Sequence, residues 1–266
     1  MIEALGSPFM QKAFVAGILV SILTGVISAF IVLRKMSFIG AGISHAAFGG
    51  VAIGFFAGAN PLLTAVLYSV AVAIGIDFTV RKGKISEDVS IGIFYSLSMA
   101  IGIALLSLSQ TYNVDLFGYL FGNILAITPE EIVLTLAVSV AVSGFIVAFL
   151  KELFLITYNE ELARVSGIRV DLLNIVFLAA LSVTIVVSIR IVGVIMVSAL
   201  LVIPGATARL FARGLRSMIA ISCAAGLASV IIGLVVSYEY DMAPGAGIVL
   251  TAATLFFIPL LLKRRS

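Results

Sequence analysis

The fold is decided by residues 36–58, MSFIGAGISHAAFGGVAIGFFAG, which directly follow the charged pair Arg34 and Lys35. These 23 residues contain no charged side chain, and they include His45, the only histidine of the protein. A helix of about 20 apolar residues crosses the hydrocarbon core of a bilayer. We therefore expect this stretch to be a membrane-spanning helix that carries one titratable side chain.

Small residues recur at every fourth position of this stretch. They are Gly42, Ala46, Gly50, Gly54 and Gly58. Residues four positions apart lie on one face of a helix. In a bilayer such a face lets the backbone of a neighbouring helix come close, which is how helices associate in lipid. We predict that this face packs against another helix.

The depth of His45 makes it a candidate functional residue. It lies ten residues after Lys35, which is about 15 Å along a helix that rises 1.5 Å per residue. This is close to the midplane of a hydrocarbon core about 30 Å thick. Imidazole is a ligand for zinc, iron or manganese. A lone buried histidine is also often structural, and both readings remain open at this point.

The composition excludes a soluble domain. Hydrophobic residues make up 62% of the chain and charged residues 11%, and the mean hydropathy is +1.27. Soluble domains carry about 25% charged residues. The single cysteine, Cys223, lies in an apolar run and offers neither a disulfide nor a metal cluster. The expected fold class is an all-α, polytopic membrane helix bundle.

Apolar runs bounded by charges or turn residues give about nine spans, or eight if the short turn around Arg190 does not separate two of them. The runs cover residues 12–33, 37–57, 61–80, 89–108, 130–150, 170–188, 191–208, 217–237 and 245–262. Placing the loop of Arg34 and Lys35 inside collects 14 of the 16 lysines and arginines on that side. Because basic residues favour the cytoplasmic side, we expect the amino terminus outside and the carboxyl terminus in the cytoplasm. This bias also explains the net positive charge without a nucleic-acid partner.

Two loops are long enough to have structure of their own. The outer loop, 109–129, contains an apolar stretch too short to span, which we interpret as a re-entrant or interfacial helix. It is followed by Thr128 as an N-cap for the next span. In the inner loop, 151–171, Asn159 caps a short helix from Glu160 to Val165, and Gly167 ends it. Such a capped, charged helix is either a docking element for another protein or a solvated connector.

Pro204 and Gly205 interrupt the seventh span. Proline removes a backbone hydrogen bond and kinks a helix. Breaks of this kind line pathways in transporters, and they also occur as ordinary packing kinks. We interpret this pair as a candidate gating kink.

The chain shows no catalytic machinery of its own. It has no G-x-x-x-x-G-K-[ST] loop for a nucleotide and no G-x-S-x-G nucleophile motif. Asp77 is expected to pair with Arg81 one helical turn later. If ATP drives this protein, the nucleotide therefore lies on a separate subunit, and an enzyme is not expected.

Six segments resemble the integral-membrane permeases of the zinc and manganese ABC importers, the ABC-3 family, and together they extend over nearly the whole chain. They are RKMSFIGAGISHAAFGGVAIG (34–54), DVSIGIFYS (88–96), NVDLFGYLFGNILAITPEE (113–131), ELARVSGI (161–168), VGVIMVSALLVIPGATARLFA (192–212) and APGAGIVL (243–250).

The resemblance implies a type II-like ABC importer permease, in which residues 1–266 form a single transmembrane domain in the cell membrane. It implies a second copy of the chain, a cytoplasmic ABC ATPase dimer that holds the ATP, and an extracytoplasmic metal-binding protein. By this resemblance we expect no cofactor on this chain, and we expect the divalent metal, zinc, manganese or iron, to be the transported substrate. Residues 159–168 resemble the family's coupling helix. Its residues here are Asn159, Glu160, Glu161, Leu162, Ala163, Arg164 and Gly167.

The second span departs from the family pattern at one position. The family has an aspartate four residues before the histidine, and this chain has Ala41 before His45. Ala41 supplies no ligand, so Ser44, Ser96, water or His45 of a second copy would have to serve the metal. An ABC importer of another small ligand, or a stand-alone channel or secondary transporter, therefore remains an alternative.

Overall fold

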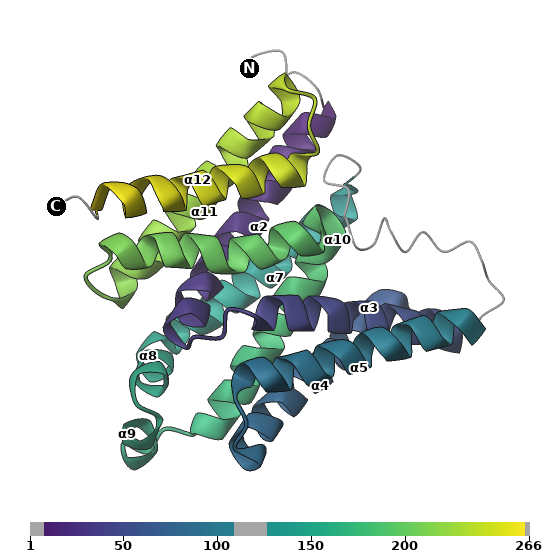
Figure 1. Ribbon diagram of the computed structural model, residues 1–266, viewed down its shortest axis with the longest axis vertical. Helices are drawn as coiled ribbons and strands as arrows, with labels where there is room; N and C mark the ends of the chain where they lie inside the picture. The colour runs from purple at the N-terminus through teal and green to yellow at the C-terminus, as the bar shows by residue number, and fades with distance from the viewer. Residues whose placement is uncertain (1–7, 109–126, 264–266) are drawn as a thin grey trace.

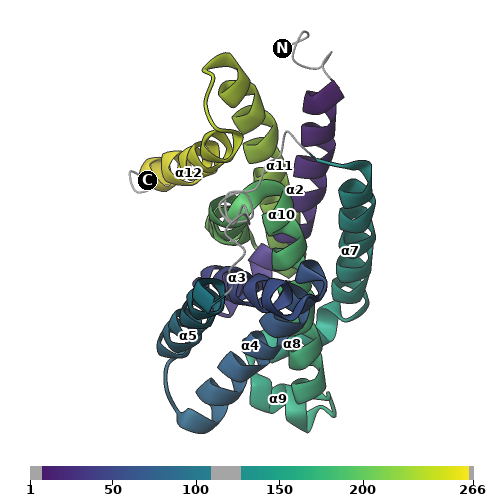
Figure 2. The same ribbon diagram turned by 90° about the vertical axis from the view of Figure 1, so that its right-hand side faces the viewer.

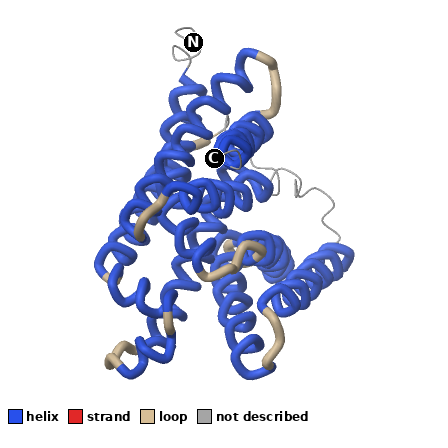
Figure 3. The backbone as a smooth tube through the Cα atoms, turned by 60° about the vertical axis from the view of Figure 1, so that its left-hand side comes forward, coloured by secondary structure: helices blue, strands red, loops and turns tan. Residues whose placement is uncertain are grey.

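In the computed structural model, the structure describes residues 8–108 and 127–263, and every element in these ranges is a helix. The helices are α2 (Pro8–Leu33), α3 (Ile39–Ala57), α4 (Pro61–Gly83), α5 (Glu87–Leu108), α7 (Pro129–Ala148), α8 (Leu150–Tyr158), α9 (Glu160–Val165), α10 (Val170–Phe211), α11 (Leu215–Glu239) and α12 (Pro244–Lys263). Within each of the two described ranges short turns join the helices, as Figure 3 shows. The expected re-entrant helix of the outer loop falls within residues 109–126 and lies outside the described residues.

Eight of the described helices are long and apolar enough to cross a membrane. One of them, α10, has 42 residues, about 63 Å at 1.5 Å per residue and twice what a bilayer requires. It is broken at Gly193, whose dihedrals (φ 80°, ψ 164°) are not helical. The first arm rises from beside α9, and the second runs back across the molecule (Figure 1). The two arms correspond to the predicted sixth and seventh spans, and the turn between them lies at Gly193, three residues after Arg190.

The loops sort into two groups at opposite ends of the helices. At one end the side chain of Arg34 donates to Thr157 and Asn174, Arg81 pairs with Glu160, and residues of α8 and α11 share the lining of one cavity. At the other end the start of α2 and the α11–α12 turn line another cavity, and Arg190 pairs with the first turn of α7. Turns that the basic residues assign to one side thus lie at the same end of the bundle, and which end faces the cytoplasm stays a prediction.

The helix that carries His45, α3, is more deeply buried than its neighbours α4 and α5. In α3, 72% of the residues in the most apolar stretch are buried, against 28% in α4 and 22% in α5. Figure 2 shows α4 and α5 beside α3. Because a smaller share of their residues is buried, α4 and α5 form the periphery, and α3 lies inside.

Glycines set the distance between α3 and its neighbours. A Cβ atom added at Gly50 would lie 2.6 Å from the Cα atom of Ala65 on α4, and one at Gly42 would lie 2.7 Å from Cγ2 of Ile91 on α5. At Gly49 it would lie 2.7 Å from the carbonyl oxygen of Ser98. At Gly49 and Gly50 an added side chain would meet backbone atoms, so the backbones approach directly there, as small residues permit in a membrane. At Gly42 it would meet the side chain of Ile91.

Gly58 departs from the packing role expected for it. No heavy atom lies within 4 Å of a Cβ built there. Gly58 is instead the C-cap of α3, with φ at 64° and its N–H group donating to the carbonyl of Phe55. This left-handed conformation is the one that favours glycine at a helix end, so Gly58 ends α3 and does not pack it.

Pro204 and Gly205 also differ from the expected interruption. Within α10 only Gly193 leaves the helical dihedrals, so the chain is redirected 11 residues before Pro204. The N–H group of Gly205 donates to Oγ of Ser28 on α2 at 2.8 Å, and a Cβ atom at Gly205 would lie 2.5 Å from the Ser28 carbonyl oxygen. The Pro204–Gly205 pair therefore lies where the second arm of α10 meets α2.

We predict that Gly50→Leu destabilises the protein by about 1–3 kcal/mol or more, the range for overpacking a close contact. The added side chain meets the backbone of α4 at Ala65, which cannot turn aside as a flexible side chain would. Thermal unfolding of the purified protein in detergent measures the effect. Gly144→Leu on α7 is the matched control, because nothing lies within 4 Å of its added Cβ atom. Equal unfolding temperatures for the two variants would contradict this account of α3.

Candidate functional site

His45 lies on the side of α3 that faces α5. Its ring contacts the ring of Tyr95 edge to face, with 4.4 Å between centroids and 70° between planes. The Nδ1 atom of His45 is buried, and it has no hydrogen-bond partner among the described residues. Buried polar atoms are usually paired, so this nitrogen is a candidate for a ligand that enters from outside the chain.

The two serines considered as pathway neighbours differ in position. The Ser44 hydroxyl is buried and donates to the carbonyl of Gly40 in its own helix at 2.7 Å, while Ser96 is exposed on α5. The residue of α5 that contacts the imidazole is Tyr95. Sequence reasoning missed Tyr95, although it precedes Ser96 directly within the segment 88–96.

Among the described residues, no three His, Cys, Asp or Glu side chains gather closely enough to hold a metal ion. Ala41, one turn before His45, adds no donor. Within the described part of one copy, the ligand atom that stands without a partner beside Tyr95 is the Nδ1 atom of His45. A metal held by so few protein ligands would keep several waters and would be released readily.

The second candidate site is the short helix α9, Glu160–Val165, which has the predicted bounds. The Asn159 side chain accepts a hydrogen bond from the Leu162 N–H group at 2.9 Å. At the other end Gly167 has φ at 81°, its N–H group donates to the Arg164 carbonyl, and that of Ile168 donates to the Ala163 carbonyl. This is a Schellman motif, so both ends of α9 are fixed by local bonds.

The two faces of α9 differ in exposure. Ala163 is fully buried and packs with Ile156, Val170 and Leu173. Leu162 and Val165 point away from the bundle, with exposed fractions of 49% and 87%. This outer face of α9 is therefore available for contact with another protein.

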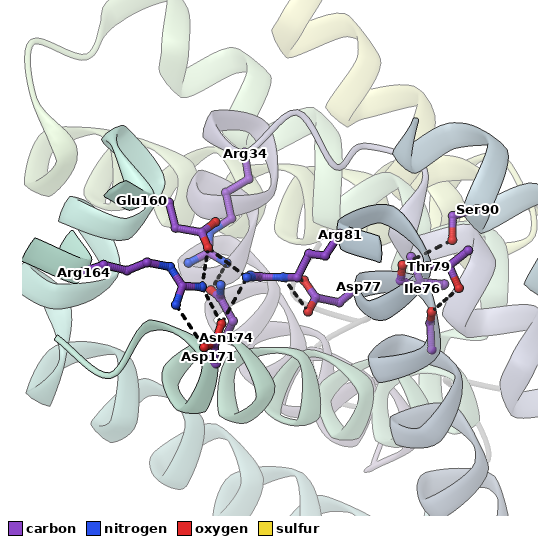
Figure 4. Close-up of polar contacts among 11 residues, drawn as sticks. Arg34, Ile76, Asp77, Thr79, Arg81, Ser90, Glu160, Arg164, Asp171 and Asn174 are labelled. Atoms are coloured by element: carbon purple, nitrogen blue, oxygen red, sulfur yellow. Dashed lines mark hydrogen bonds and ion pairs between the residues drawn. The ribbon is translucent and has the colours of Figure 1, made fainter. Parts of the chain in front are cut away.

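An ion-pair network joins α9 to two other helices, as Figure 4 shows. On α4, Nε of Arg81 pairs with Asp77 at 2.8 Å, which confirms the expected pair. Nη1 of Arg81 reaches Glu160 at 2.8 Å and Asp171 at 3.2 Å. Arg164 of α9 pairs with the same two acids at 2.9 and 2.6 Å, and this raises the pKa of its guanidinium. The contacts of Arg81 outside its own helix could not be foreseen from sequence.

Arg34, in the turn before α3, is nearly buried beside this network. Its guanidinium donates to Thr157 at 3.1 Å and to Asn174 at 3.0 Å, and it lies 4.5 Å from the ring centroid of Phe177. Burial lowers the pKa of Arg34 to about 10. Since this value is above neutral pH, the side chain keeps its positive charge. The sequence had indicated only a topological role for Arg34.

We predict that Gly167→Ala lowers the free energy of local unfolding of α9 by about 1–2 kcal/mol, which is the cost of placing an L-residue in the left-handed conformation. Hydrogen exchange of the amides of residues 162–168 should become faster. Ser166→Ala is the control, because Ser166 has an ordinary φ of −76° and should exchange as before. Unchanged exchange in Gly167→Ala would show that the Schellman motif does not fix the end of α9.

Comparisons with known proteins agree with this architecture. A family model described as the ABC 3 transport family matches residues 6–263. The manganese transport system membrane protein MntC of Listeria monocytogenes is 38% identical over 95% of this chain and 90% of its own length. The manganese import system permease protein ScaB of Streptococcus gordonii is 35% identical over 94% of this chain and 90% of its own.

Two solved structures share the fold. PsaBC from Streptococcus pneumoniae, solved with a Fab, superposes with a TM-score of 0.85 at 36% identity, covering 97% of this chain and 93% of its own. An inward-facing putative metal-chelate type ABC transporter superposes with a TM-score of 0.75 at 15% identity, over 95% and 85% of the two chains, and shows the fold alone. The chain therefore belongs to the ABC 3 transport family, as an all-helical permease that is the transport subunit, with ATP hydrolysis on a separate subunit.

Proposed function

We propose that this chain is the membrane-spanning permease of an ATP-driven importer of manganese(II). The observation that carries the proposal is the match over 94–95% of the chain to permeases named for manganese transport. The unpartnered Nδ1 atom of His45, on the interior helix α3, supports the transport of a metal ion. Imidazole is a ligand for transition metals and has little affinity for apolar or sugar cargo.

The transport unit is proposed to be a homodimer in the cell membrane, with one permease domain in each copy. A cytoplasmic ATPase dimer binds and hydrolyses the ATP, and an extracytoplasmic protein delivers the metal. This orientation places α9 and the turns at residues 34–38, 84–86 and 212–214 in the cytoplasm. The basic residues near these turns support it, since lysine and arginine favour that side.

Transport is proposed to proceed by alternating access. The exposed face of α9, with Leu162 and Val165, contacts the ATPase, and ATP binding and hydrolysis move α9. The metal passes His45 with part of its water shell retained, because Ala41 supplies no carboxylate. A hard cation such as manganese(II) is suited by oxygen ligands, including water, so weak binding at His45 allows the ion to leave on the cytoplasmic side.

The test is reconstitution in liposomes of the permease, its ATPase and the metal-loaded binding protein. Manganese uptake that requires ATP supports the proposal, and competition by zinc(II) and iron(II) ranks the three metals. Preferential uptake of zinc or iron would show that the proposed metal is wrong, while the proposed class, an ATP-driven metal importer, would stand. Flux through the permease without the ATPase would instead indicate a channel or a secondary transporter.

We predict that His45→Ala lowers manganese uptake by about tenfold or more, because loss of a group at a metal site typically costs 10- to 100-fold. The complex with the ATPase should still assemble, since His45 lies within α3, far in sequence from α9. Cys223→Ala on α11 serves as the control and should transport normally. Full uptake by His45→Ala would remove His45 from the metal path.

A further inference from the structure

The contacts of α9 divide into two kinds. Its apolar contacts are with residues of α8 and α10, its neighbours in the chain. Toward α4, which lies 79 positions earlier, the contact is polar, from Arg81 to Glu160 at 2.8 Å. Near this pair lies a cavity of about 180 Å³ that both residues help to line, together with Arg34, Asp77 and Glu87. The connection between α9 and α4 therefore depends on charged side chains, because packed apolar side chains do not fill this space.

Arg81 has the geometry of a connector between helices. Its Nε atom holds Asp77 on its own helix, and its Nη1 atom holds Glu160 of α9 and Asp171 of α10. In Figure 4 its guanidinium group lies between Asp77 on one side and the two other acids on the other. The planar fork of a guanidinium fixes direction as well as distance, which a lysine ammonium does not.

Stability alone is a weak explanation for this arrangement. The side chain of Arg81 is 30% exposed, and those of Glu160 and Asp171 are 41% and 66% exposed. Ion pairs at such exposure contribute little to the free energy of folding. What the pairs do provide is a defined position of α9 relative to the end of α4.

The position of α4 in turn fixes that of α3. At Gly50 and Gly54 the backbone of α3 lies directly against Ala65 and Pro61 of α4, with no room for a side chain. Two helices packed backbone to backbone move together, because packed interiors do not deform continuously. A displacement delivered to the Arg81 end of α4 therefore reaches the helix that carries His45.

We propose that Arg81 is a positioning residue that couples α9 to the metal pathway: it holds Glu160 against the inner end of α4, so that movement of α9 is passed through α4 to α3. This inference rests on the proposed function, in which an ATPase moves α9. The inference also assigns different roles to the two faces of α9. Glu160 faces the bundle and pairs with Arg81, whereas Leu162 and Val165 face outward.

The experiment uses the complete complex in proteoliposomes, with manganese(II) as the probe and manganese taken up per ATP hydrolysed as the readout. Arg81→Gln and Glu160→Gln should each lower this ratio about fivefold or more, the lower end of typical coupling between sites, while ATP hydrolysis continues. Because both changes remove the same contact, the double variant should be no worse than the poorer single one. Arg81→Lys, which keeps the charge and loses the fork, should be intermediate.

Lys82→Gln is the matched control. It removes the same charge one residue later, at an exposed side chain that lies over the Phe78 ring, and it should leave the ratio unchanged. A readout independent of transport is hydrogen exchange of residues 160–165 in the assembled complex, which should become faster in Arg81→Gln and stay the same in Lys82→Gln.

A wild-type ratio in Arg81→Gln, or a double variant whose loss is the product of the two single losses, would overturn the inference. So would unchanged exchange in α9. These results are distinct from failure of the proposed function, which would appear as absence of ATP-dependent manganese uptake by the wild-type complex.

Discussion

The backbones of α3 and α4 contact each other directly, and this contact holds the helix that carries His45 in place. In a bilayer, helices gain nothing by hiding apolar side chains from lipid, so close fit must hold them together. At Gly50 the fit is so close that an added Cβ atom would lie 2.6 Å from Ala65. This contact keeps α3 in the interior and with it the imidazole of His45. It also joins α3 and α4 into one closely packed unit.

The charged residues are arranged around the end of that unit. Arg34 leads into α3 and is held by Thr157 and Asn174, and Arg81 stands near the end of α4 with acids from α9 and α10. Both arginines thus connect the α3–α4 pair to the segment 157–174. The charged end of the bundle is therefore connected through α3 and α4 to its apolar middle.

Much of this arrangement could be predicted because it is local in sequence. The lengths of the apolar runs predicted the spans, and the capping residues Asn159 and Gly167 predicted the bounds of α9. The four-residue spacing predicted the Asp77–Arg81 pair. The fold class followed from hydropathy and from the family resemblance. Thr128 caps α7 as expected, with Glu131 completing a capping box.

What could not be predicted depends on contacts between distant segments. Arg81 and Glu160 are 79 positions apart, and the sequence around either residue does not predict that they pair. The edge-to-face contact of His45 with Tyr95 depends on how α3 and α5 are rotated. Pro204 was expected to interrupt the second arm of α10, but it keeps helical dihedrals, and the break lies at Gly193, near the turn expected around Arg190. The φ of 80° at Gly193 lies in the region that favours glycine.

The break at Gly193 divides α10 into two helical arms that meet at an angle. A single non-helical residue joins these arms, so no flexible loop lies between one crossing of the membrane and the next. The second arm, residues 194–211, is about 27 Å long at 1.5 Å per residue, and a turn of about 5° at the pivot would carry its far end through roughly 2 Å. The two backbone dihedrals of Gly193 thus set the angle between the arm that begins at Val170 and the arm that packs against Ser28.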